Sequence, residues 1–146
     1  MKKILLMHGA NLNILGKRDP KHYGNVTLFD IEKITKEEAK KFEYDVITYQ
    51  SNCEGKLIDT LQAETPHCKG IIINPGAFTH YSYALYDALL DTQLPIVEVH
   101  LSAIHSREKW RSHSVTAPAA IQVIWGKKEI GYKDAVRVLV EYIQKC

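Results

Sequence analysis

A doubly wound α/β sheet of five parallel strands, with helices on both faces, is the fold class that this sequence predicts. Five short apolar runs, each of the length expected for a buried parallel strand, alternate along the chain with longer segments of helical period. There is no internal repeat and no low-complexity segment. At 146 residues the chain can bury one sizeable core, so residues 1–146 are expected to form a single domain.

The strands are expected, in chain order, at KILLM (3–7), YDVITYQ (44–50), GIIIN (70–74), PIVEV (95–99) and AIQVIW (120–125). The helices between and after them are expected near residues 27–42, 54–65, 79–91 and 131–145. Thr27 is the expected N-cap of the first helix, and Ser51 or Asn52 that of the second, with Glu54 in its opening turn. This length and alternation are flavodoxin-like, with an expected strand order of 2-1-3-4-5.

The composition excludes several classes of protein. Hydrophobic content of 45% and charged content of 25% are close to the globular average, which excludes disordered and fibrous chains. Nineteen basic and seventeen acidic side chains give a net charge of +2, and the basic pairs are interleaved with acids, so no nucleic-acid partner is expected. The first apolar run is too short for a signal-peptide core, and no stretch approaches a membrane span. Three cysteines without a CxxC pair indicate reduced thiols and a cytoplasmic location.

The expected strand order also predicts where a ligand would bind. In such a sheet the winding direction reverses between the first and third strands, and ligands bind beyond the carboxyl ends of the strands near that point. The segments that leave the first, third and fourth strands are residues 8–24, 74–90 and 98–114. They are the most polar and aromatic strand exits of the chain, so we expect them to converge on a site.

Phosphate, flavin and metal sites are not favoured at these exits. Neither GxGxxG nor GxxxxGK[ST] is present, and the first exit is too long and bulky to cradle a phosphate closely. No HExxH pair occurs among His80, His100, His105 and His113. We therefore expect no metal and no cofactor.

Acid–base chemistry fits the exits better. A histidine exchanges protons near neutral pH, and strand alternation puts Glu98 and His100 on the same side of the sheet, where the carboxylate can orient the ring. A tyrosine ordinarily has a pKa of ~10, so making its phenolate near neutrality requires about 4 kcal/mol. Arg18 could supply stabilisation of that order to Tyr23 at about 4 Å. A base and an acid on separate exits indicate elimination of water through an enolate, which Asn11 or a water that it holds could stabilise.

The same exits offer groups for recognising hydroxyls and a carboxylate, namely Asn74, Gly76, His80, Asp87, Ser102 and Arg111. A structural interpretation is the alternative for the reactive groups. In that interpretation His100 is a satisfied buried histidine, and Tyr23 packs on the domain while Arg18 is solvated.

Beyond this reasoning, the chain resembles the type II 3-dehydroquinate dehydratases over essentially its whole length. The order and spacing of the matching segments are those of the family: GANLNILGKRDPKHYG, QSNCEG, IIINPGAFTH, ALYDAL, PIVEVHLS, REKWRSHS and IGY. The chain departs from the family pattern at His8, Ala10, Tyr86 and Ala103. None of these departures removes a group that the chemistry needs.

The resemblance implies a hydro-lyase that converts 3-dehydroquinate to 3-dehydroshikimate, a step of the shikimate pathway and of aromatic amino-acid biosynthesis, without metal or Schiff base. The implied mechanism is an anti elimination in which the Tyr23 phenolate, stabilised by Arg18, removes the C2 proton. A water near Asn11 holds the enolate, and His100, supported by Glu98, protonates the departing C1 hydroxyl.

The resemblance also implies further contacts and an assembly. The backbone amides of Leu101 and Ser102 would receive the substrate carboxylate, and Arg107 would close over the site together with the loop from about 18 to 24. The family assembles as homo-oligomers, dodecamers built from trimers. Two other hypotheses stay open, namely a non-catalytic flavodoxin-like binding or scaffold protein, and a different α/β hydro-lyase acting on a related cyclic polyol acid.

Overall fold

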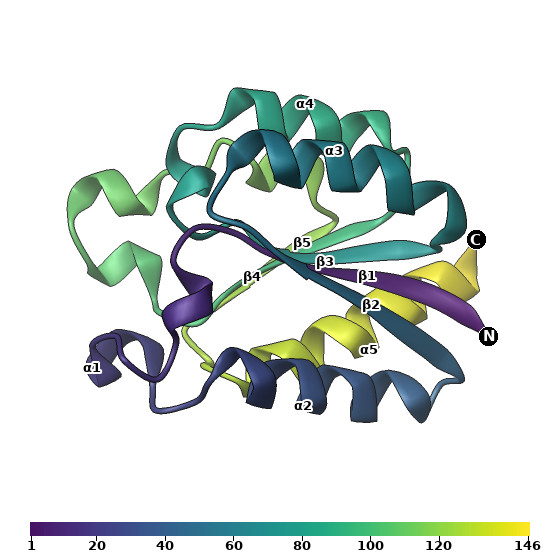
Figure 1. Cartoon of the computed structure of the whole chain (residues 1–146), viewed down its shortest axis with the longest axis horizontal. Coiled ribbons are helices and arrows are strands. Elements are labelled where there is room, and N and C mark those ends of the chain that lie inside the picture. Colours follow the sequence, from purple (N-terminus) through teal and green to yellow (C-terminus); the bar gives the residue numbers. More distant parts are fainter.

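The computed structural model describes all residues from 1 to 146, and its central feature is one parallel sheet (Figure 1). The strand order is β2-β1-β3-β4-β5, which confirms the predicted doubly wound, flavodoxin-like fold. The strands are β1 (Lys2–His8), β2 (Tyr44–Gln50), β3 (Gly70–Asn74), β4 (Ile96–His100) and β5 (Gln122–Trp125). The winding therefore reverses between β1 and β3, as predicted.

Two pairs of helices cover the two faces of the sheet (Figure 1). One face packs against α2 (Leu28–Lys40) and α5 (Ile130–Lys145), and the other against α3 (Glu54–Glu64) and α4 (Tyr83–Asp91). The side chains of β1 alternate accordingly: Ile4 and Leu6 enter the first core cluster, whereas Leu5 and Met7 enter the second. The apolar run from Ile4 to Met7 in this strand is buried on both sides, which explains why no polar residue interrupts it.

Of the two predicted helix N-caps, one is present in the structure and the other is not. Thr27 caps α2 in a capping box, because its hydroxyl accepts from the Asp30 amide while the Asp30 carboxylate accepts from the Thr27 amide. The expectation that Ser51 or Asn52 caps α3 was wrong, since Cys53 occupies the N-cap without a side-chain bond. The Ser51 hydroxyl instead accepts from the Cys53 amide, 2.9 Å away, within the preceding turn.

The expected helix over 79–91 starts later than predicted. Residues Gly76–His80 form a 3-10 helix, and α4 begins only at Tyr83, where the Ser82 hydroxyl accepts from the Leu85 amide. The fifth strand is likewise shorter at its start than 120–125, because a 3-10 turn at Ala117–Ala119 precedes it. The remaining short helices are α1 (Pro20–Tyr23) and 3-10 turns at Leu12–Ile14, Thr65–His67, Ile104–Ser106 and Lys109–Ser112.

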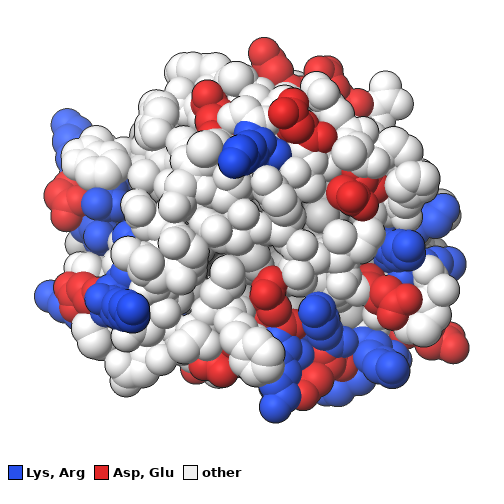
Figure 2. Space-filling model, in the orientation of Figure 1, with Lys and Arg blue, Asp and Glu red and all other residues white.

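Charged side chains are mixed in sign over the face seen in Figure 2, where lysines and arginines stand beside acids around an uncharged centre. None of the helices has both the length and the apolar character that crossing a bilayer requires.

Candidate active site

The segments that leave β1, β3 and β4 meet in one cavity at the carboxyl edge of the sheet, on the side of α1 (Figure 1). The cavity contains about 430 Å³ of free space, part of it open to solvent. Its lining is made of Asn11, Leu12, Arg18, Tyr23, Asn74, Gly76, Ala77, His80, His100, Leu101, Ser102, Ile104, Arg107 and Arg111. The structure thus brings together eleven of the thirteen residues that the sequence singled out; Glu98 and Asp87 are the two outside the lining.

Two glycines allow the segment after β1 and the segment after β3 to contact each other through their backbones. The Gly9 amide donates to the Asn74 carbonyl at 2.7 Å, and a Cβ added to Gly9 would lie 2.0 Å from the carbonyl oxygen of Pro75. Conversely, a Cβ on Gly76 would lie 2.6 Å from the carbonyl oxygen of Ala10, and Gly76 has a φ of +62°. Neither position can carry a side chain without moving backbone, so the two loops hold a fixed relative position.

Asn11 takes up a left-handed conformation at the start of the first exit. Its φ is 69°, a region in which asparagine is tolerated better than most residues, and it precedes the 3-10 turn Leu12–Ile14. The backbone amide of Asn11 donates to the side-chain oxygen of Asn52, 2.8 Å away. The same oxygen also accepts from the side-chain amide of Gln50 at 3.1 Å. The loop after β2 therefore braces the loop that carries Asn11.

Tyr23 lies between two arginines. Its hydroxyl oxygen is 2.8 Å from a guanidinium nitrogen of Arg18 and 2.8 Å from one of Arg107. The Arg18 guanidinium also stacks over the Tyr23 ring at 3.7 Å from its centroid. Burial lowers the pKa of Arg18, which its contact with Tyr23 partly offsets. Two cationic donors are thus directed at one phenol oxygen.

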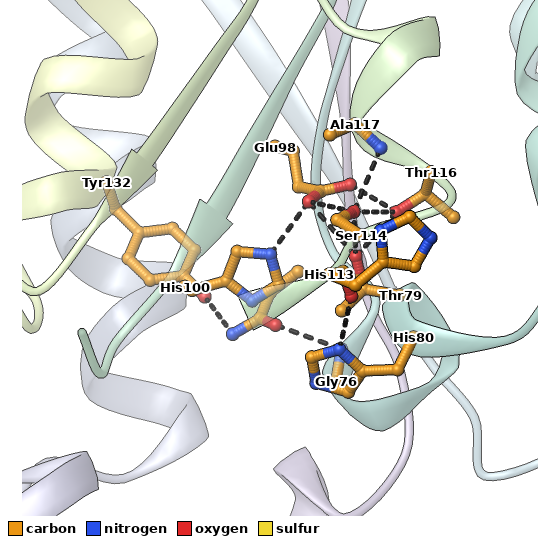
Figure 3. Close-up of polar contacts among 11 residues, drawn as sticks. Gly76, Thr79, His80, Glu98, His100, His113, Ser114, Thr116, Ala117 and Tyr132 are labelled. Atoms are coloured by element: carbon orange, nitrogen blue, oxygen red, sulfur yellow. Dashed lines mark hydrogen bonds and ion pairs between the residues drawn. The ribbon is translucent and has the colours of Figure 1, made fainter. Parts of the chain in front are cut away.

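His100 and Glu98 are hydrogen-bonded at the end of β4, with His100 Nε2 2.8 Å from Glu98 Oε2 (Figure 3). The carboxylate of Glu98 is 1% exposed and lies behind the ring, outside the cavity lining. Burial alone would raise the pKa of Glu98, but hydrogen bonds from His100, Thr116 and Thr79 outweigh it and leave this pKa below its usual range. Because an ionised carboxylate only accepts hydrogen bonds, Nε2 of His100 is the donor in this contact.

Asn74 and His80 are held by hydrogen bonds to neighbouring protein groups, and Figure 3 shows His80 beside His113. The Asn74 side chain accepts from the Gly76 amide at 3.0 Å and donates to the buried Tyr132 hydroxyl at 3.2 Å. His80 Nδ1 donates to the His113 carbonyl at 2.7 Å, which fixes the ring tautomer. Burial lowers the pKa of His80, so its free Nε2 is an acceptor near neutrality.

Asp87 and Arg111, both predicted to recognise the substrate, differ from the other predicted residues in their surroundings. Asp87 lies on the exposed side of α4 and does not line the cavity. Arg111 lines the cavity, but it also pairs with Glu108 and lies 4.1 Å from the centroid of the Trp110 ring.

The sequence reasoning missed the polar residues behind the cavity. Thr79, Ser114 and Thr116 surround the Glu98 carboxylate, and Tyr132 on α5 contacts Asn74. The only local signal was the spacing of Ser114 and Thr116, which puts two hydroxyls on one side of an extended segment. No group of three or more histidine, cysteine, aspartate or glutamate side chains is arranged to hold a metal ion.

Comparison with known proteins finds one consistent set of relatives. The model of the family "Dehydroquinase class II" matches residues 2–140. The chain is 50% identical over 135 residues to the catabolic 3-dehydroquinase 1 of Aspergillus fumigatus, covering 92% of this chain and 90% of that protein. It is 46% identical over 144 residues to the 3-dehydroquinate dehydratase of Anoxybacillus flavithermus, covering 99% and 97%. The crystal structure of the type II dehydroquinase from Butyrivibrio crossotus superposes with a TM-score of 0.91 at 41% identity, covering 95% and 97%.

Proposed function

The chain belongs to the dehydroquinase class II family of hydro-lyases, and from this premise we propose that it converts 3-dehydroquinate to 3-dehydroshikimate and water in the shikimate pathway. The observation that carries the proposal is the placement of Tyr23, between two arginines, on the same cavity as the His100–Glu98 pair. This cavity presents a base and an acid to one small molecule, as an anti elimination requires.

Tyr23 is the proposed base. As the phenolate, paired with Arg18 and Arg107, it takes the C2 proton, and the electron pair of the broken C–H bond passes into an enolate on the neighbouring carbonyl. Asn11, which lines the cavity, is the proposed holder of a water that donates to the enolate oxygen. The two arginines remain fully charged throughout the step, so they favour the phenolate without taking its role as base.

His100 is the proposed acid. When the enolate collapses, the C1–O bond breaks and the hydroxyl leaves with a proton from His100 as water, which forms the C1–C2 double bond. Because Nε2 of His100 faces Glu98, Nδ1 is the ring nitrogen left for the substrate. Glu98 acts through His100 and does not touch the substrate.

The substrate's hydroxyls and carboxylate would be recognised by Asn74, His80, the Leu101–Ser102 segment and Arg111, which share the cavity with the base and the acid. Asp87 stays a proposed substrate contact that this single chain does not bring to the cavity. We also propose that residues 1–146 act as one catalytic domain in a cytoplasmic homo-oligomer, a dodecamer of trimers.

A direct assay of the reaction tests the function. Purified protein is incubated with 3-dehydroquinate, and the conjugated product is followed by its ultraviolet absorbance. Tyr23→Phe removes one oxygen from the proposed base, and Tyr142→Phe, on the half-exposed outer side of α5, is the matched control. A chelator is added in a parallel reaction. We expect turnover by the wild-type protein and the control, in the presence of chelator as well, and none by Tyr23→Phe.

Each other outcome has a definite meaning. Without turnover by the wild-type protein the proposed function is wrong, and a panel of related cyclic polyol acids then separates another hydro-lyase from a non-catalytic binding protein. If Tyr23→Phe turns over at the wild-type rate, the reaction stands and the assignment of the base is wrong.

A further inference from the structure

Hydroxyl groups from two separate segments surround the carboxylate of Glu98 (Figure 3). Thr79 comes from the 3-10 helix Gly76–His80, and Ser114 and Thr116 come from the loop before Ala117. Thr79 Oγ1 and Ser114 Oγ each lie 3.1 Å from Glu98 Oε2, and the Thr116 hydroxyl bonds to Oε1. The hydroxyls also contact one another, since Thr79 Oγ1 is 2.6 Å from Ser114 Oγ and 2.7 Å from Thr116 Oγ1.

The hydrogen-bond donors in this cluster converge on the carboxylate of Glu98, which suits its ionised form. Each hydroxyl has a single proton, and an ionised carboxylate only accepts hydrogen bonds. Ser114 Oγ already accepts from the Ala117 amide at 3.0 Å, so its own proton is free to point at Glu98 or at a neighbouring hydroxyl. Three hydroxyl protons and a ring N–H from His100 are thus available to the two carboxylate oxygens, and an ionised Glu98 can accept from all four donors.

We propose that the hydroxyls of Thr79, Ser114 and Thr116 form a positioning cluster that holds Glu98 as the oriented carboxylate and thereby keeps His100 ready to donate its proton. The proposal deepens the proposed function and rests on it. The three residues act through Glu98 and His100, and none of them lines the cavity.

The cluster supplies the stabilisation that burial removes. Glu98 is 1% exposed, and water cannot solvate its charge. Hydrogen bonds from Thr116 and Thr79 are among the causes that keep the pKa of Glu98 low. The other titratable group whose charge acts on this pair is His80, in the same 3-10 helix as Thr79, and Arg111, in the turn Lys109–Ser112, acts in turn on His80. Both lie toward the cavity, so neither replaces a lost hydroxyl.

Thr116 provides the sharpest test, because it is 1% exposed and is the cluster's contact to Oε1. Thr116→Val replaces the hydroxyl by a methyl group of similar size, and Thr116→Ser keeps the hydroxyl. Thr35→Val is the matched control: Thr35 is fully buried in α2, and its hydroxyl bonds only to the Ile31 carbonyl. For each variant, kcat and KM for 3-dehydroquinate are measured as functions of pH.

For Thr116→Val we expect kcat to fall about tenfold or more, the usual scale for losing a hydrogen bond to a charged group, with little change in KM. The acid limb of the kcat profile should move to higher pH, since the lost bond raises the pKa of Glu98. Thr116→Ser should recover most of the loss, and Thr35→Val should keep the wild-type profile. An unchanged profile in Thr116→Val overturns the proposal, and so does a Thr116→Ser variant as impaired as the valine variant.

Two further measurements keep the proposal open to refutation. Should Thr116→Val not fold, Ser114→Ala removes one oxygen from a partly exposed position and should shift the acid limb in the same direction. The titration of Glu98 can also be followed without turnover, by carbon NMR of its carboxyl group. A higher titration pH in the valine variant supports the cluster even if the wild-type protein proves inactive on 3-dehydroquinate, and an identical titration refutes it.

Discussion

Replacing Arg18 by glutamine should expose how Tyr23 is activated. Arg18 contacts the phenol twice, with a nitrogen 2.8 Å from the hydroxyl oxygen and the guanidinium stacked 3.7 Å from the ring centroid. Glutamine retains a hydrogen-bond donor on a shorter side chain and removes the charge. The variant therefore isolates the electrostatic part of the contact.

The expected magnitude follows from the geometry. Two unit charges about 4 Å apart interact by about 4 kcal/mol at an effective dielectric constant near 20. Arg18 is only partly buried, and solvent screening reduces this to about 2 kcal/mol, which corresponds to about 30-fold in rate. Arg107 remains 2.8 Å from the same oxygen, so the loss should be larger than additive when both arginines are replaced.

The assay is kcat/KM for 3-dehydroquinate over a range of pH. Lys17→Gln is the control, because it makes the same charge change at the neighbouring, exposed position of the same loop. We expect Arg18→Gln to lose about 30-fold at neutral pH and to recover toward alkaline pH, where the solvent removes the tyrosine proton without help from the arginine. A loss that is constant over the whole range would refute the reasoning, since it would mean that Arg18 only positions Tyr23.

Three further predictions concern the scaffold of the site. Gly9→Ala places a Cβ 2.0 Å from the Pro75 carbonyl oxygen, so it should cost about 3 kcal/mol in the free energy of unfolding, and a wild-type denaturation midpoint would contradict the docking of the two loops. Tyr132→Phe leaves the side-chain amide of Asn74 without its buried partner. We expect the free energy of unfolding to fall by about 1 kcal/mol and KM to rise. Unchanged values of both would be inconsistent with the contact. Hydrogen bonds from two cationic partners lower the pKa of the buried Glu38, so its stabilisation is present above the pKa of an ordinary carboxyl and is lost as the pH falls below it. Thermal denaturation at neutral pH and at about pH 4 should therefore show a smaller acid-induced drop for Glu38→Gln than for the wild-type protein.

The fold was predictable because its strands carry unbroken apolar runs. Ile71, Ile72 and Ile73 are all fully buried, as expected of a central parallel strand. The start of α4 was missed because a 3-10 helix precedes it, and that 3-10 helix begins at Gly76, which has a positive φ and packs against the Ala10 carbonyl. That contact is tertiary and leaves no periodic signal.

The candidate site likewise contains some residues that were predictable from the sequence and others that were not. Residues next to strand ends were predictable from topology, and the alternation of β4 anticipated the contact between His100 and Glu98. The hydroxyls around Glu98 were not, because serine and threonine are common in loops and only the tertiary fold brings Thr79 to Ser114, 35 positions away. A contact across such a separation has no signature in spacing.

The reciprocal glycine contacts between the first two exits have a consequence for how this scaffold can diversify. Each glycine rests on a carbonyl oxygen of the other loop, Gly9 on Pro75 and Gly76 on Ala10. Because a Cβ added at either glycine meets backbone atoms and no movable side chain, a compensating change would have to shift two backbone segments at once. New substrate preferences are therefore accessible to this chain mainly through the segments around Arg18 and Arg107, where side chains alone make the contacts. The relative position of the two loops is therefore the part of the site that stays constant while the side chains around it change.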